Sequence, residues 1–152
     1  RLSPATVPRL LRQLEQVAET IQARIRAEGA TPSLQSALRR LFEAEASAMG
    51  AREMLLSAIQ EEMNGTLAAA KSSALKLHCS ELSQAISSLA YDLAATDFGP
   101  RLLPEVPADG GADDLVLGRQ QVHTYLFYRS RTIAGGTSEV QKNVIARDLF
   151  GA

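Results

Sequence analysis

Apolar residues recur at helical spacing from the first residues of the chain. Intervals of three and four residues put them on one face of a helix over residues 4–28. Pro4, directly after Ser3, is typical of a first helical turn, and Gly29 is typical of a helix end. The inward positions predicted for this helix are Val7, Leu10, Leu11, Leu14, Val17, Ala18, Ile21 and Ile25.

Two further long helices are expected over residues 34–63 and 66–93. Thr31, Pro32 and Ser33 form a start signal before the second helix, and Asn64-Gly65 separates it from the third. In the second helix the apolar positions are Leu34, Leu38, Leu41, Phe42, Met49, Leu55, Leu56, Ile59 and Met63. In the third they are Leu67, Ala70, Ala74, Leu77, Leu82, Ile86, Leu89 and Leu93.

The helical pattern stops between residues 96 and 118. This stretch holds three of the six prolines and four of the ten glycines, which predicts a long surface loop. Helical spacing returns over residues 120–131 and 137–150, the last with Val140, Val144, Ile145 and Leu149 inward. No strand alternation is present, so we expect an all-α fold, an antiparallel four-helix bundle with short connections, as one domain over residues 1–152.

Composition narrows the class of protein. Hydrophobic residues make up 45% and charged residues 22%, as in soluble globular proteins. The net charge of −1, without a basic stripe, argues against nucleic acid, and no apolar run reaches the roughly 20 residues that span a membrane. The single Cys79 forms no internal disulfide and suits the cytoplasm. Because the chain begins at Arg1 rather than Met, we expect it to be a fragment of a longer protein.

The sequence gives little support for a metal site or for a catalytic triad. A di-iron bundle uses Glu-x-x-His pairs, and neither His78 nor His123 has a Glu three residues before it, so no metal site is predicted. His78 is expected to be a packed or partly exposed helix residue. No nucleophile-elbow glycines surround Cys79. The acidic pairs Glu61-Glu62 and Asp113-Asp114 are expected to be solvated.

One segment does indicate a ligand. Residues 133–151 read IAGGTSEVQKNVIARDLFG, with Gly135, Gly136, Thr137 and Ser138 directly before an amphipathic helix. A helix start presents unpaired N–H groups, which suit a phosphate or an electron-rich ring edge, and glycines let a planar ligand approach. An ordinary glycine turn with an N-cap explains the same residues equally well. No Gly-Lys-Ser/Thr ending is present, so the segment is not a P-loop.

The order Gly-Thr-Ser-Glu-Val-Gln, followed by Asn-Val-Ile-Ala-Arg-Asp-Leu-Phe-Gly, resembles the C-terminal signature of the flavin-dependent acyl-CoA dehydrogenases. The Ile-Ala-Gly-Gly-Thr-Ser-Glu form of this signature is similar to that of actinobacterial members which act on sterol side-chain thioesters. The resemblance implies the C-terminal helical third of a chain whose N-terminal α and middle β domains are missing. It also implies FAD, an acyl-CoA substrate, a homo- or hetero-oligomer (dimer or tetramer) and electron-transfer flavoprotein or a similar acceptor.

The same resemblance implies roles for single residues. Gly136, Thr137 and Glu139 match positions that contact FAD. Gly135 stands where many members have the catalytic Glu, so the chain has no catalytic residue at that position. A second subgroup carries the base on the first helix in a Glu-Arg-Leu context, and such a Glu would lie just before Arg1. The fragment alone is expected to be inactive.

Other positions depart from the family pattern. Asp92 replaces a Gln in the loop that holds the pyrophosphate, and that loop lacks its paired glycines. The first helix keeps Arg24 and Arg26 but lacks the Phe that follows in the family, and Leu126 and Phe127 stand near the usual Arg-Asp pair. These departures imply a flavin site that is retained on one side and eroded on the other. Two interpretations remain: a subunit of an acyl-CoA dehydrogenase, or a non-catalytic helical scaffold derived from one.

Overall fold

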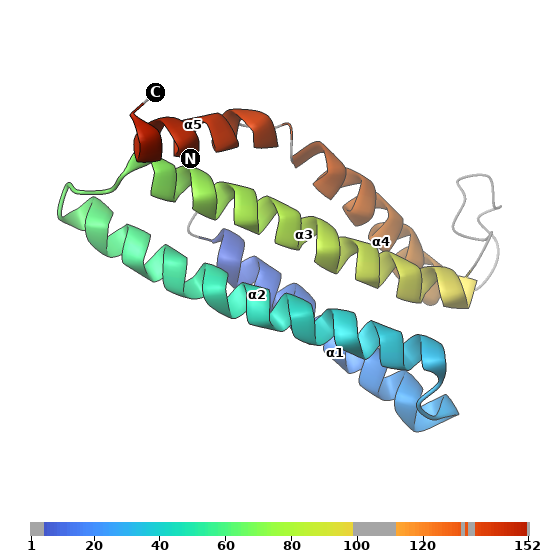
Figure 1. Cartoon of the computed structure of the whole chain (residues 1–152). Helices are drawn as coiled ribbons and strands as arrows, with labels where there is room; N and C mark the ends of the chain where they lie inside the picture. Colours follow the sequence, from blue (N-terminus) through green and yellow to red (C-terminus); the bar gives the residue numbers. More distant parts are fainter. Residues whose placement is uncertain (1–4, 99–111, 132, 134–135, 152) are drawn as a thin grey trace.

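The chain folds as an antiparallel helical bundle. The computed structural model describes residues 5–98, 112–131, 133 and 136–151, and over these residues it is helical with no strand. Its helices are α1 (Thr6–Glu28), α2 (Pro32–Met63), α3 (Ala69–Phe98), α4 (Ala112–Arg131) and α5 (Ser138–Phe150). The first three run side by side in alternating directions, and α4 and α5 follow one another back along α3 (Figure 1). The all-α prediction is confirmed, with α4 and α5 together taking the place of a fourth helix.

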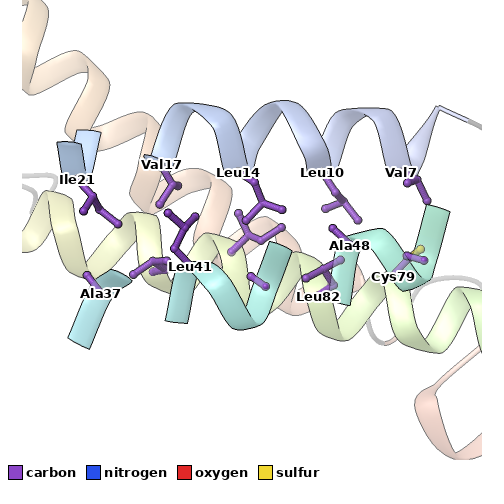
Figure 2. Packing of buried hydrophobic residues seen from close by; sticks show 14 of the residues in the cluster. Val7, Leu10, Leu14, Val17, Ile21, Ala37, Leu41, Ala48, Cys79 and Leu82 are labelled. Carbon is purple, nitrogen blue, oxygen red and sulfur yellow. The ribbon is translucent and has the colours of Figure 1, made fainter. Parts of the chain in front are cut away.

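The core lies between α1, α2 and α3. Buried side chains of α1 point toward small and branched residues of the other two helices (Figure 2). Leu10, Ile21, Ile86 and Leu89 are almost fully enclosed, and each such side chain stabilises the fold by about 1.5–3 kcal/mol. The α1 stripe predicted from the sequence is confirmed at Val7, Leu10, Leu14, Val17 and Ile21.

The ends of the helices follow the expected local chemistry. Gly29 ends α1 with a φ of 79°, in the region that favours glycine. Thr31 caps α2, because its hydroxyl oxygen accepts a hydrogen bond from the Leu34 N–H at 3.3 Å, and Pro32 occupies the first turn. Helix α3 starts at Ala69 rather than at the predicted Thr66, whose hydroxyl donates to the Glu61 carbonyl at 3.3 Å.

The inward face of α2 differs from the prediction. Its buried positions are mostly alanine: Leu34, Ala37, Leu41, Ala44, Ala48, Ala51 and Ala58. Five large apolar residues predicted to point inward are instead exposed, namely Phe42, Met49, Leu56, Ile59 and Met63. The alanine face lets α2 pack closely on α1 and α3, which leaves its larger apolar residues on another side. The apolar residues of α2 therefore belong to two faces of the helix, one buried and one exposed.

Helix α3 is the central helix, because it contacts each of the other four. Its predicted stripe is buried at Leu82, Ile86, Leu89 and Leu93. Serines are also buried there, and Ser83 satisfies its hydroxyl by donating to the Cys79 carbonyl at 2.6 Å. The burial of α3 therefore extends beyond a single stripe.

The predicted loop over residues 96–118 is too long. Helix α3 continues to Phe98 and α4 already begins at Ala112, so residues 112–118 are helical. Asp113 and Asp114 fall in the first turn of α4, where the helix dipole favours acidic residues. In α5, Val140 and Leu149 are exposed rather than inward, and Gln141 is buried instead. Among the described residues, no helix is long and apolar enough to cross a membrane.

Candidate functional site

The turn before α5 presents a threonine whose hydroxyl caps that helix. Thr137 is the N-cap of α5, and its hydroxyl oxygen accepts a hydrogen bond from the Val140 N–H at 3.3 Å. The Gln141 N–H donates to the Thr137 carbonyl at 3.0 Å. A hydroxyl both accepts and donates, so the proton of this exposed side chain is available to an acceptor outside the chain.

Gly136 is required by the fold at this turn. Its φ is +98°, a conformation that L side chains rarely adopt, and an added Cβ would lie 2.7 Å from Gln141 Nε2. Because Gln141 Nε2 is the far end of a flexible side chain, the positive φ is the stronger of the two constraints. The expected neighbour, Gly135, lies outside the described residues.

Helix α5 is attached to α3 at both of its ends. Lys76 of α3 donates a hydrogen bond from Nζ to the carbonyl oxygen of Gly136. At the other end, Asp148 Oδ2 accepts from the Ala70 N–H at 3.0 Å and so caps the first turn of α3. These two contacts fix the position of the turn relative to the bundle.

Glu139 lies in the first turn of α5 and faces solvent. Its carboxylate is paired with Lys142 at 3.2 Å, three residues further along the helix, and its side chain is 77% exposed. An exposed pair of this kind contributes little to stability. The carboxylate can therefore exchange this partner for a hydrogen-bond donor of a ligand at little cost.

Together these groups offer a mixed set of donors and acceptors. The first N–H groups of a helix lack intrahelical partners and lie at the positive end of its dipole. Thr137 adds a hydroxyl donor, and Glu139 adds an acceptor. Such a set fits a ligand that carries both acceptor and donor edges, such as a flavin, and so the residues described here are compatible with FAD.

Comparison with known proteins gives the family. The model for "Acyl-CoA dehydrogenase, C-terminal domain" matches residues 7–150, nearly the whole chain. The chain belongs to the acyl-CoA dehydrogenase family. A solved structure described as "Tcur3481-Tcur3483 steroid ACAD" shares the fold, with a TM-score of 0.64 and 22% identity. The similarity covers 98% of this chain but 35% of that one, so the present chain spans about a third of its length. The comparison with curated protein sequences gives no match.

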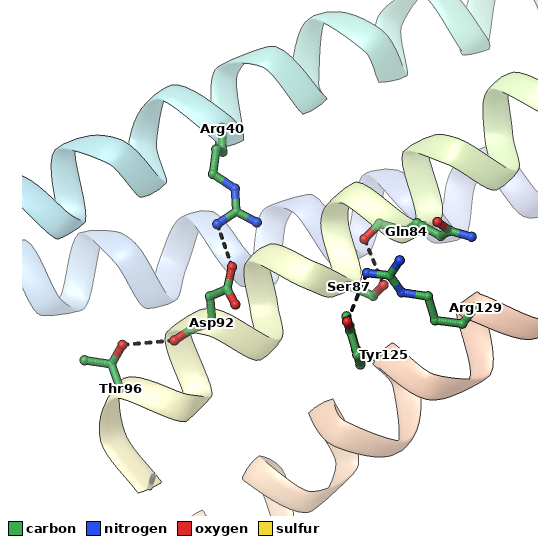
Figure 3. A network of polar contacts seen from close by, with 7 residues as sticks. All are labelled: Arg40, Gln84, Ser87, Asp92, Thr96, Tyr125 and Arg129. Carbon is green, nitrogen blue, oxygen red and sulfur yellow. Dashed lines mark hydrogen bonds and ion pairs between the residues drawn. The ribbon is translucent and has the colours of Figure 1, made fainter.

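Within this acyl-CoA dehydrogenase domain, Asp92 has a partner on a neighbouring helix. Arg40 of α2 contacts Asp92 Oδ2 at 2.6 Å, and the Asp92 carbonyl accepts from the Thr96 hydroxyl at 2.9 Å (Figure 3). Both side chains of the ion pair are partly exposed, which limits its contribution to stability. Arg40 therefore offsets the negative charge that Asp92 brings to the region expected to meet the pyrophosphate.

Near the predicted position of the family's Arg-Asp pair, α4 shows an aromatic surface. The Arg129 guanidinium lies 4.7 Å from the Tyr125 ring centre (Figure 3). The Tyr125 ring also stacks on Tyr91 of α3, with the ring centres 4.8 Å apart. Leu126 and Phe127 are both exposed. These two side chains provide no charged group where the family pattern has two.

The surroundings of His78 and Cys79 in α3 favour a structural role for both side chains over a catalytic one. His78 Nε2 lies 3.0 Å from the Ser47 carbonyl oxygen and is partly buried, as expected. Burial raises the pKa of the Cys79 thiol to about 11, so it is protonated at neutral pH and a poor nucleophile. No group of three or more potential metal ligands occurs among the described residues.

Three residues that shape the site were missed by sequence reasoning. Lys76 holds the turn, Gln141 fills the space beside Gly136, and Asp148 caps α3 from the end of α5. One signal was visible for Asp148: an acidic residue in the last turn of a helix opposes the dipole, so it is favourable only with a donor nearby. For Lys76 and Gln141, no local signal in the sequence separates them from other polar helix residues.

Proposed function

We propose that this chain is the C-terminal domain of an FAD-dependent acyl-CoA dehydrogenase, in which Gly136, Thr137 and Glu139 contact the flavin. The proposal rests on one observation above all: a fixed turn that presents the exposed Thr137 hydroxyl, in a chain matched by the family model over residues 7–150. The longer protein would remove hydrogen from the α and β carbons of an acyl-CoA thioester in the cytoplasm. Electron-transfer flavoprotein or a similar acceptor would then take the electrons.

Each site residue has a distinct task in this proposal. The Thr137 hydroxyl donates to an acceptor atom of the flavin while its oxygen continues to cap α5. Gly136 keeps the turn free of a side chain, and Lys76 holds its carbonyl so that the turn keeps its position. Glu139 accepts from a flavin donor. When bound, FAD supplies the hydride acceptor of the reaction.

The base that removes the α proton would come from outside this sequence. Gly135, at the position where many family members have the catalytic Glu, has no side chain that can accept a proton. A second subgroup of the family carries the base on the first helix, and a base at the matching position would lie just before Arg1. The domain alone would then bind part of the cofactor and catalyse nothing.

The substitutions at Asp92, Leu126 and Phe127 support a shared site. We propose that the turn before α5 serves one flavin, while the altered region around Asp92, which the sequence placed in a loop but which lies in α3, faces a position without flavin. The longer chain would pair with a second acyl-CoA dehydrogenase chain that supplies an intact loop. The steroid description of the structural neighbour and the Ile-Ala-Gly-Gly-Thr-Ser-Glu motif favour a sterol side-chain thioester as the acyl group.

The ratio of flavin to protein tests this proposal. The longer chain purified alone should hold little FAD, and copurification with its partner chain should raise the ratio to one flavin per pair of chains. One flavin per chain in a homo-oligomer would contradict the shared site. The absence of flavin from every assembly would instead favour the alternative, a helical scaffold that retains the family fold without its cofactor.

A further inference from the structure

A single peptide group joins Lys76 of α3 to the turn before α5. The Gly136 carbonyl, which accepts the hydrogen bond from Lys76 Nζ, and the Thr137 N–H belong to the same peptide group. In a trans peptide the C=O and the N–H lie in one plane and point in opposite directions. The carbonyl faces Lys76, and the Thr137 N–H therefore points away from it.

The fold leaves the Thr137 N–H available as a donor. Thr137 is the N-cap of α5, and the first N–H groups of a helix have no intrahelical acceptor. Its hydroxyl oxygen and its carbonyl oxygen are engaged with the Val140 and Gln141 N–H groups. In the part of the chain that the structure describes, no group accepts from the Thr137 N–H. Because Thr137 is exposed, an acceptor outside this domain can reach it.

The surroundings of the Gly136 carbonyl strengthen its contact with Lys76. Helix α5 lies alongside the first half of α3, and Lys76 is partly buried between them (Figure 1). The buried side chain of Gln141 lies beside Gly136. Water is therefore partly excluded from the carbonyl side of the peptide group. A hydrogen bond from an ammonium group is stronger there than in water, because the local dielectric constant is lower.

Polarisation of this peptide group carries the effect of the lysine charge to the other side of the turn. A positive charge at the carbonyl oxygen draws electron density away from the peptide nitrogen, so the Thr137 N–H becomes a stronger donor. The positive end of the α5 dipole acts at the same place. The carboxylate of Glu139 is paired with Lys142, so these two residues together bring no net charge to the turn.

We propose that Lys76, through the peptide group between Gly136 and Thr137, makes the Thr137 N–H a charge-assisted donor to a negatively charged atom of FAD. The inference rests on the proposed function. It gives Lys76 a second task besides holding the turn, which is to stabilise negative charge on the ligand. Lys76 is a positioning residue in this role, because it acts through Thr137 and does not itself touch FAD.

Two parts of FAD carry acceptor atoms of this kind. The pyrophosphate oxygens are negatively charged whether the flavin is oxidised or reduced, whereas the oxygen and nitrogen atoms of the flavin ring gain negative charge on reduction. A donor to the pyrophosphate strengthens the binding of both oxidation states equally. A donor to the ring strengthens the binding of the reduced state more. The affinity for FAD and the reduction potential together identify the acceptor.

Substitutions of Lys76 in the assembled longer protein test the inference. Lys76→Gln keeps a side-chain N–H donor but removes the charge, and it should weaken FAD binding by roughly tenfold. Lys76→Arg keeps both the charge and the donors, and it should bind FAD nearly as wild type does. Lys71→Gln is the matched control, because it removes a charge from the same helix. Lys71 contacts Ser57 and Glu61 of α2, so its loss should leave FAD affinity unchanged.

The reduction potential separates the two acceptors. If the Thr137 N–H donates to the flavin ring, Lys76→Gln should weaken the binding of reduced FAD roughly tenfold more than that of oxidised FAD. For a two-electron couple this lowers the potential by about 30 mV. If the N–H donates to the pyrophosphate, both affinities should fall together and the potential should stay unchanged. Either result, with wild-type binding in Lys76→Arg, supports the inference.

Hydrogen exchange of the protein without FAD separates charge from position. Residues 138–141 should be as protected in Lys76→Gln as in wild type. If the loss of FAD affinity instead follows a loss of protection in this variant, Lys76 only holds the turn, and the inference is overturned. Wild-type affinity in Lys76→Gln would also overturn it, while leaving the proposed function intact. The absence of FAD from the wild-type assembly would overturn the proposed function itself.

Discussion

Lys76 of α3 donates a hydrogen bond to the carbonyl oxygen of Gly136, sixty residues later in the chain. This contact joins the central helix of the bundle to the turn that presents Thr137. The turn therefore owes its position to a residue that belongs to no recognisable motif. If the turn holds flavin, the bundle takes part in the binding through this lysine.

Replacing Lys76 by Met should loosen the turn more than it harms the bundle. Loss of a partly buried, charged donor should lower the free energy of unfolding by about 1–2 kcal/mol. Amide hydrogen exchange over residues 136–141 should rise, while the core of α3 stays protected. Lys142→Met is the matched control, because Lys142 has only an exposed partner, Glu139. Equal exchange in the two variants would show that the Lys76 contact does not hold the turn.

A methyl group at Gly136 should be costly. Gly136→Ala meets both a positive φ and Gln141 Nε2 at 2.7 Å from the new Cβ, so we expect a loss of about 2–3 kcal/mol in urea unfolding. Gly50→Ala is the control, since it lies inside α2 with no atom within 4 Å of its Cβ. That change should stabilise the helix by about 0.5–1 kcal/mol. Similar effects of the two changes would contradict the conformation described for the turn.

Asp148 should stabilise a helix other than its own. Asp148→Ala removes the acceptor for the Ala70 N–H and should lower the free energy of unfolding by about 1 kcal/mol. Asp148→Asn keeps an acceptor oxygen and should retain most of that stability. Hydrogen exchange should show the loss of protection in the first turn of α3 rather than in α5. Fraying confined to α5 would count against the interhelical cap.

Alkaline pH should destabilise the bundle through Cys79. Burial raises the thiol pKa from 9.0 to about 11, so the folded state holds its proton at a pH where the unfolded state has lost it. The unfolded state therefore binds fewer protons, and stability should fall as pH rises from about 9 to about 11, by about 2–3 kcal/mol at most. Cys79→Ala should flatten this part of the curve relative to wild type. Parallel pH curves for the two proteins would rule out the contribution of Cys79.

The sequence predicts the architecture well where one face of a helix is buried. The α1 stripe and the stop and start signals at Gly29 and Thr31 are sufficient to place that helix and the beginning of the next. Periodicity failed on α2 because it does not distinguish an alanine face that packs inward from a Met and Leu stripe that stays outside. Periodicity therefore predicts Phe42 and Met49 as core residues, whereas both are exposed.

The loop before α4 and the site before α5 show a different limit of prediction from the sequence. Prolines and glycines predicted a loop up to residue 118, but helix α4 begins at Ala112, where Asp113 and Asp114 supply a start signal that glycine content obscured. The motif located the turn before α5 and its N-cap Thr137. It gave no information about Lys76 or Asp148, because their contacts span sixty or more residues and depend on how the helices pack.

The affinity of the assembled longer protein for FAD, measured with Thr137→Val and Thr137→Ser, tests the central claim most directly. Valine removes the hydroxyl that caps α5 and points to the proposed flavin, and serine retains it. Thr20→Val, which removes an exposed hydroxyl of α1, is the control. We predict that Thr137→Val weakens flavin binding at least tenfold, while Thr137→Ser and Thr20→Val bind as wild type does. Unchanged affinity in Thr137→Val would contradict the assignment of this turn to FAD.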